Sequence, residues 1–122
     1  MKTQFEFEIK EDYLQLNLTG EYDKVKLLSF PVIIKTKCEK EKIFKVLVNG
    51  LEIRNSNLST ADRFFIGEKF GLELRDQIKI AVVWPAKDID KFAETVALNR
   101  GGNMYVVGDY EAAVEWMLNS QA

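Results

Sequence analysis

The sequence predicts a single α/β domain with a mixed five-strand sheet and four helices. Three observations lead to this fold class: two N-terminal segments in which apolar and polar residues alternate, three short apolar runs with β-branched residues, and a helix-like segment after every strand from the second onward. Strands that alternate with helices pair in parallel through crossovers, whereas two strands joined by a short turn pair antiparallel. We therefore expect an antiparallel hairpin followed by parallel strands.

The length of 122 residues favours one domain over residues 1–122, because no linker, repeat or low-complexity segment divides the chain. The N-terminus alternates where a signal peptide would have an apolar block. No apolar run approaches the roughly 20 residues that a membrane-spanning helix needs. We expect a cytoplasmic protein without stable membrane insertion.

The hairpin is marked by apolar residues at every second position, namely Phe5, Phe7 and Ile9, then Leu14, Leu16 and Leu18. Polar residues between them indicate that one sheet face near the hairpin is solvated. Asp23 offers an N-cap for a helix over roughly 24–41. Pro31 lacks the amide that would bond to the carbonyl four residues back, so either it kinks this helix or Ser29 caps a later start.

The later strands are expected at Ile43–Val48, Ile78–Val83 and Met104–Val107, each followed by a helix. The first of these helices begins near Thr60 and is amphipathic. Its Gly67 and Gly71 lie four residues apart, which allows close packing against the sheet. Capping residues for the last two helices are Asp88 and Asp109, and the Asn99-Arg100-Gly101-Gly102 string predicts a left-handed helix end.

The composition excludes several kinds of chemistry. The chain has no histidine and one cysteine, Cys38, so the common general base, the common metal ligand and an internal disulfide are all missing. Carboxylates are not grouped at adjacent strand ends as a metal or phospho-receiver site requires. A net charge of −2 with both signs interspersed gives no footprint for nucleic acid. We expect no enzyme activity, no cofactor and no metal.

The second half of the chain resembles the anti-sigma-factor-antagonist-like proteins of the STAS superfamily, in the branch called STAS/SEC14-like. The residues that carry the likeness are KIAVV at 79–83, FAETVALNRG at 92–101 and the pattern D-x-E-A-A-x-x-W at 109–116. The order of elements matches that family over nearly the whole chain. The resemblance implies a bacterial regulatory protein that binds other proteins.

The resemblance also points to the connection after the strand at 43–48. In phosphorylatable relatives an Asp-Ser-Ser/Thr-Gly turn lies there, at the N-terminus of the next helix, and a serine is the regulated residue. This chain has Leu58-Ser59-Thr60-Ala61, preceded by Asn57, so the motif is a degraded form of that turn. Ser59 or Thr60 is either a helix cap or a phospho-switch, and both can hold at once.

Arg63 lies one turn after these hydroxyls and could approach a phosphoryl group there. Trp84 closes the strand at 78–83 and is either packed under the loop or free as a contact anchor. The loops that leave parallel strands should share one edge of the sheet. We therefore take Asn57, Ser59, Thr60, Arg63 and Trp84 as the candidate partner-binding or switch residues.

Two hypotheses of function follow. The first is a non-catalytic regulatory module that binds another protein through residues 55–60, with a homodimer as a further option. The second is a small domain for a lipid or other apolar ligand, prompted by the SEC14-like resemblance, eight phenylalanines and two tryptophans. A closed apolar cavity between sheet and helices would favour the second hypothesis.

Overall fold

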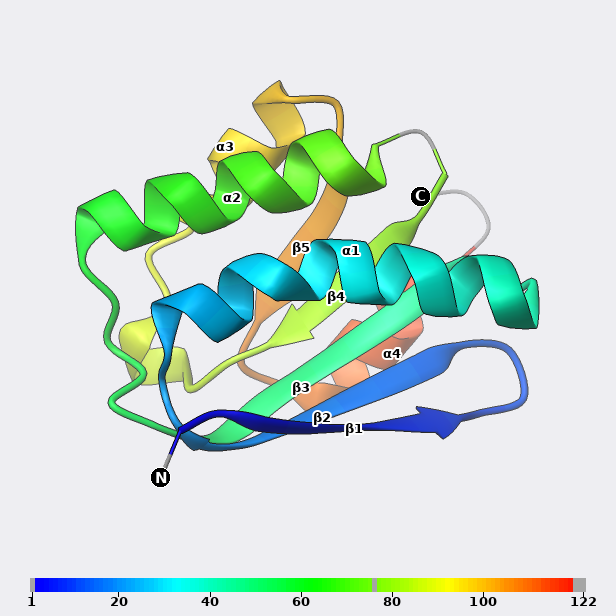
Figure 1. Cartoon of the computed structure of the whole chain (residues 1–122), viewed down its shortest axis with the longest axis horizontal. Helices are drawn as coiled ribbons and strands as arrows, with labels where there is room; N and C mark the ends of the chain where they lie inside the picture. Colours follow the sequence, from blue (N-terminus) through cyan, green and yellow to red (C-terminus); the bar gives the residue numbers. More distant parts are fainter. Residues whose placement is uncertain (1, 76, 120–122) are drawn as a thin grey trace.

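The molecule is built on one five-strand sheet with the strand order β1-β2-β3-β4-β5. The computed structural model describes residues 2–75 and 77–119. Strand β1 is antiparallel to β2, and the other neighbouring pairs are parallel (Figure 1). The strands are β1 (Gln4–Ile9), β2 (Leu14–Glu21), β3 (Lys45–Arg54), β4 (Lys79–Val83) and β5 (Asn103–Val107). The predicted mixed sheet is confirmed.

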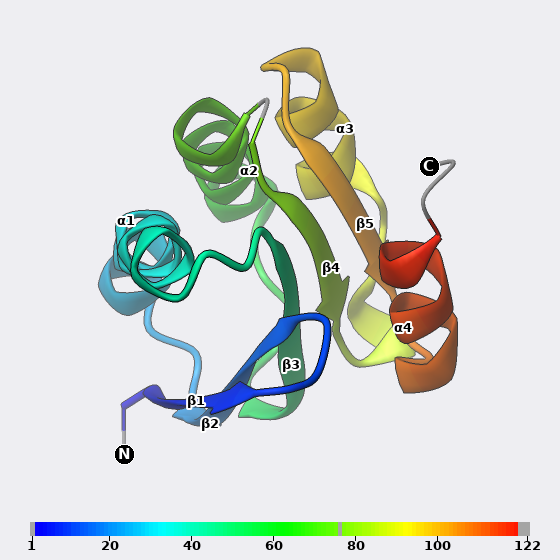
Figure 2. The ribbon, with the colours of Figure 1, turned by 90° about the vertical axis from the view of Figure 1, so that its right-hand side faces the viewer.

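Helices cover the two faces of the sheet unequally. The helices are α1 (Lys24–Glu41), α2 (Thr60–Leu74), α3 (Phe92–Asn99) and α4 (Tyr110–Leu118), with a short 3₁₀ helix η1 (Ala86–Asp88). Figure 2 shows α1, α2 and α3 on one face and α4 alone on the other. Helix α4 packs mainly against β3, β4 and β5. On that face α4 reaches the hairpin through Tyr110, whose hydroxyl donates to Gln15 of β2 at 2.6 Å and lies 3.2 Å from the Tyr13 hydroxyl.

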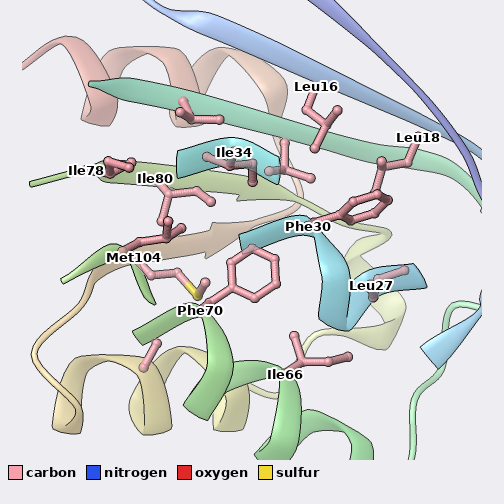
Figure 3. Close-up of a cluster of buried hydrophobic side chains, with 14 of the residues drawn as sticks. Leu16, Leu18, Leu27, Phe30, Ile34, Ile66, Phe70, Ile78, Ile80 and Met104 are labelled. Atoms are coloured by element: carbon pink, nitrogen blue, oxygen red, sulfur yellow. The ribbon is translucent and has the colours of Figure 1, made fainter. Parts of the chain in front are cut away.

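The main core lies between the sheet and the three helices of the first face. Leu16, Leu18 and Ile80 point from the strands toward Phe30 of α1 and Phe70 of α2 (Figure 3). A smaller cluster on the opposite face joins β3 and β4 to α4 through Leu47, Ala81, Val83, Ala113 and Met117. Strands β3 and β4 are thus apolar on both sides, because each side meets a helix.

Helix α1 has the bounds that the sequence predicts. The Asp23 carboxylate accepts a hydrogen bond from the Val25 amide, and the left-handed Lys42 ends the helix with its amide bonded to the Cys38 carbonyl. The helix runs through Pro31, whose ring is buried, so the later start at Ser29 is wrong. No helix in the described residues is long and apolar enough to span a membrane.

Strand β3 is longer than the sequence predicts. It continues past Val48 to Arg54, because its second half pairs with the end of β2 after a register shift between Asn17 and Thr19. Glu52 and Ile53 then lie opposite Thr19 and Gly20. The connection to α2 is therefore confined to residues 55–59.

The predicted start of the third helix is wrong. Helix α3 begins at Phe92, whose amide donates to the Asp90 carboxylate, and Asp88 ends the preceding 3₁₀ turn. The Asp88 carboxylate is not available as a cap, since it accepts a hydrogen bond from the Ser56 hydroxyl at 2.6 Å. The predicted cap at Asp109 is confirmed, because its carboxylate accepts from the Glu111 amide.

Gly67 and Gly71 pack against a helix and not against the sheet, which corrects the expectation. A Cβ atom on Gly67 would lie 2.4 Å from the Ala93 carbonyl oxygen, and one on Gly71 would lie 2.6 Å from that of Ala97. Helices α2 and α3 therefore approach with their backbones nearly in contact. The predicted glycine end of α3 is confirmed by Gly101, with φ of 94°.

Candidate functional site

The candidate site is the edge of the sheet where the parallel strands end. The connections that leave β3, β4 and β5 meet there; Figure 1 shows the first of them beside η1. The Trp84 amide donates to the Val107 carbonyl, and a Cβ on Gly108 would lie 2.7 Å from the Cβ of Ala86. The predicted common rim is thus present. We call its outermost connection, residues 55–59 with Thr60, the rim loop.

Ser59 is the N-cap of α2. Its hydroxyl oxygen accepts a hydrogen bond from the Asp62 amide at 3.1 Å, and its backbone is extended. The side chains of Asn57, Ser59 and Thr60 are all exposed. The capping role is confirmed, and the two hydroxyls stay accessible from solvent at the positive end of a 15-residue helix.

The first turn of α2 also carries a negative side chain. The Asp62 carboxylate accepts a hydrogen bond from the Tyr22 hydroxyl at 2.9 Å and lies 3.5 Å from the Lys24 ammonium. Burial, with the hydrogen bond to Asp62, raises the pKa of Tyr22. Lys24 is therefore a cation close to the N-terminus of α2, where the sequence pointed to Arg63.

Arg63 turns into the protein and ties the rim loop to the connection after β4. Its guanidinium donates to the carbonyls of Leu58 (3.0 Å) and Asp88 (2.8 Å), to the carboxylate of Asp90 (3.2 Å), and to the amide oxygen of Asn57 (3.0 Å). The residue is only 9% exposed. Four of its five N–H donors are bonded within these two loops, so Arg63 would break bonds that hold the loops together if it turned toward a group on Ser59.

Trp84 lies under the rim loop. Its side chain is 8% exposed, and its indole N–H donates to the Ser56 carbonyl at 2.8 Å. The ring lies against Gly50, where a Cβ would come within 2.4 Å of the ring atom Cε3. Of the two alternatives for Trp84, the packed position is the one observed. The ring supports the loop from below and presents little surface to a partner.

Sequence reasoning missed Ser56, Asp88 and Asp90 as members of this arrangement. Ser56 is buried and links the rim loop to Asp88 through its hydroxyl, whereas its sequence neighbours are polar loop residues that give no such signal. The pattern of aspartates before a helix indicated capping, and this holds for Asp90. Nothing in their spacing along the sequence shows that Arg63 would contact both Asp88 and Asp90.

A small apolar cavity lies beneath these loops. Its volume is about 80 Å³, and its walls come from the sheet, α1, α2 and the segment after β4; they include Phe30, Leu58, Phe70, Trp84, Ile89 and Val106. Sites for drug-sized ligands measure roughly 300–1,000 Å³. The cavity is thus too small for an acyl chain in this conformation and could take only a much smaller apolar molecule.

Among residues 2–75 and 77–119, no cluster of three or more histidine, cysteine or acidic side chains could hold a metal ion. Cys38 of α1 is fully buried, and burial raises the pKa of its thiol to about 12. The exposed chemistry of the rim is limited to hydroxyls, an amide and the surrounding charges.

Comparison with solved structures identifies the fold. An anti-sigma factor antagonist from Mycobacterium paratuberculosis superposes with a TM-score of 0.62 at 11% identity, covering 94% of this chain and 93% of that one. The chain has a STAS-like fold. An uncharacterized protein from Shewanella loihica with a SpoIIAA-like fold matches with a TM-score of 0.52 at 18% identity, over 94% and 93% of the two chains. No family model and no curated protein matches the sequence.

Proposed function

We propose that this protein is a non-catalytic regulatory module that binds another protein through the rim loop. The observation that carries the proposal is the contrast within this loop: Ser56 and Arg63 anchor it from inside, while Asn57, Ser59 and Thr60 face solvent. One structural relative with the same fold is an anti-sigma factor antagonist. Its name supports a regulatory role for a protein of this shape.

Preorganisation supports this use of the loop. Association costs free energy when a loop or side chain must be ordered, about 0.5–1.5 kcal/mol for each immobilised side chain. Here the Asn57 amide oxygen is held by Arg63 and the Ser59 hydroxyl oxygen by the Asp62 amide before any partner arrives. The rim loop is thus a surface whose polar groups already have fixed positions.

We further propose that phosphorylation of Ser59 or Thr60 controls this contact. A phosphoryl group adds about −1.5 to −2 charge and would lie at the N-terminus of α2, beside free first-turn amides. The Lys24 ammonium near this point would attract the phosphoryl group, and the Asp62 carboxylate, 3.5 Å from that ammonium, would repel it. The phosphoryl group would therefore add negative charge and bulk to the exposed surface of the rim loop. It would do so without a contact to the buried Arg63.

A comparison of variants that keep the fold tests the proposal. Ser59→Asp adds a charge and retains a good N-cap residue, and Thr60→Glu adds a charge at the next position. Thr36→Glu is the matched control, because Thr36 is exposed on α1 away from the rim. Each tagged protein is incubated with cytosolic extract of the native host, and retained proteins are quantified by mass spectrometry.

We expect at least one protein that the wild type and Thr36→Glu retain equally and that both rim variants lose by tenfold or more. The proposal fails if no retained protein distinguishes the rim variants from Thr36→Glu. Native mass spectrometry of the wild type tests the second candidate, an apolar-ligand domain, for which the cavity beneath Trp84 is the supporting observation. A co-purified small molecule favours that candidate, and a doubled mass indicates a homodimer.

A further inference from the structure

The edge of the sheet formed by β1 is a second surface, separate from the rim loop. Among the described residues β1 has a neighbouring strand on one side only, and Figure 2 shows it at the outside of the sheet. Its apolar residues remain partly uncovered: Phe5 is 36% exposed and Ile9 is 56% exposed. A free edge presents unpaired backbone donors and acceptors, which another strand can bind.

The two faces of this edge differ in character. Phe5 and Phe7 lie on the α1 face, where Phe5 contacts Phe30 at 5.5 Å between ring centroids. The alternate positions carry Glu6 and Glu8, both exposed, on the other face. Helix α4 packs mainly on β3 to β5. The Glu8 carboxylate accepts a hydrogen bond from the Asn17 amide of β2 at 2.6 Å.

We propose that the β1 edge binds an extended segment of another protein in which apolar residues alternate with lysine or arginine. Added as a sixth strand, such a segment would place its apolar side chains beside Phe5, Phe7 and Ile9 and its basic side chains opposite Glu6 and Glu8. Cross-strand pairs of opposite charge stabilise a sheet, and like charges in that position destabilise it.

Charge complementarity separates this partner from a second copy of the chain. Two copies paired over the length of β1 would bring Glu6 and Glu8 of each against the same two carboxylates of the other. Lys10, 3.6 Å from Glu8, lies beyond the end of the strand and offsets little of that repulsion. The edge therefore favours a basic strand over its own sequence.

Labelled peptides test the proposal directly. The probes are a seven-residue peptide alternating valine and lysine, the same peptide with glutamate for lysine, and a scrambled valine–lysine peptide of equal composition without alternation. Fluorescence anisotropy gives the affinities for wild type, for Glu6→Lys with Glu8→Lys, and for a control with the same charge change at exposed helix positions, Glu39→Lys with Glu115→Lys. Amide shifts in a ¹⁵N spectrum locate the site.

We expect the alternating basic peptide to bind wild type and the control within twofold of each other and to bind the β1 variant at least tenfold more weakly. The glutamate peptide should gain affinity for that variant, and the shifts should centre on β1. Equal affinity for the scrambled peptide, shifts elsewhere, or no binding would overturn the proposal and leave Glu6 and Glu8 as guards against edge aggregation. A dimer of the wild type that the β1 variant loses would assign the edge to a second copy and would also overturn it.

Discussion

Replacing Arg63 by methionine should destabilise the protein by about 3 kcal/mol. Methionine keeps an unbranched apolar stem beside the cavity and removes all four hydrogen bonds of the guanidinium. A hydrogen bond to a charged group contributes roughly 1.5–3 kcal/mol, and four such bonds set an upper limit well above the expected loss. Asn57 is exposed and the Asp90 side chain is 53% exposed, so water replaces Arg63 at both.

The cost therefore comes mainly from the two carbonyls that the loops partly bury, those of Leu58 and Asp88. At the lower bound of about 1.5 kcal/mol each they account for the stated value. For a domain of this size that loss corresponds to a fall in Tm of roughly 10 °C. Urea unfolding followed by circular dichroism measures the free energy, and hydrogen exchange should show faster exchange of the rim-loop amides.

The matched control is Arg54→Met, because Arg54 is an exposed arginine at the end of β3. Exposed substitutions of this kind usually change stability by less than about 0.5 kcal/mol. If Arg63→Met costs under about 1 kcal/mol, or no more than Arg54→Met, then the guanidinium does not tie the two loops together. The preorganisation argument for the rim loop would fail with it.

Three further outcomes follow from the structure. Gly50→Ala should lower the free energy of unfolding in urea by about 1–3 kcal/mol, because the new Cβ would lie 2.4 Å from the Trp84 ring. An unchanged free energy would mean that the ring moves freely. Ser59→Ala should cost about 1 kcal/mol and Ser59→Asp almost nothing; equal losses would contradict the cap. Burial raises the pKa of the Cys38 thiol from 9.0 to about 12. The protonated thiol therefore contributes to the stability of the folded state below pH 9, and that contribution is lost as the pH rises from 9 to 12. The free energy of unfolding should therefore fall less for Cys38→Ala than for wild type between pH 9 and 12. Identical dependence on pH for the two proteins would refute the raised pKa.

The elements that the sequence predicted correctly are those with strong local signals. Alternating residues from Phe5 to Leu18 mark the hairpin, and Asp23 marks the start of α1; both depend on groups only a few residues apart. The likeness to antagonist proteins rested on the later strands and helices, and the fold comparison confirms it. Periodicity and capping need no knowledge of distant contacts, which is why they could be recognised.

The errors occurred where distant segments decide the structure. Residues 49–54 were expected in the connection after a strand ending at Val48, yet pairing with the end of β2 extends the strand through them. Gly67 was expected at the sheet but meets α3, because nothing in a helix pattern shows which neighbour its small face approaches. In both cases contacts with distant segments outweighed the conformational preference of the local sequence.

The sequence by itself determined the type and order of the elements and the position of two hydroxyls, Ser59 and Thr60, at the start of a helix. Only the tertiary structure decided what surrounds them: Arg63 faces inward, Trp84 lies beneath the rim loop and Ser56 bonds to Asp88. The physical reason is that hydrogen bonds within a helix turn join residues three or four apart, whereas these contacts join residues 25 to 32 apart. Their geometry depends on how the sheet brings the ends of β3 and β4 together.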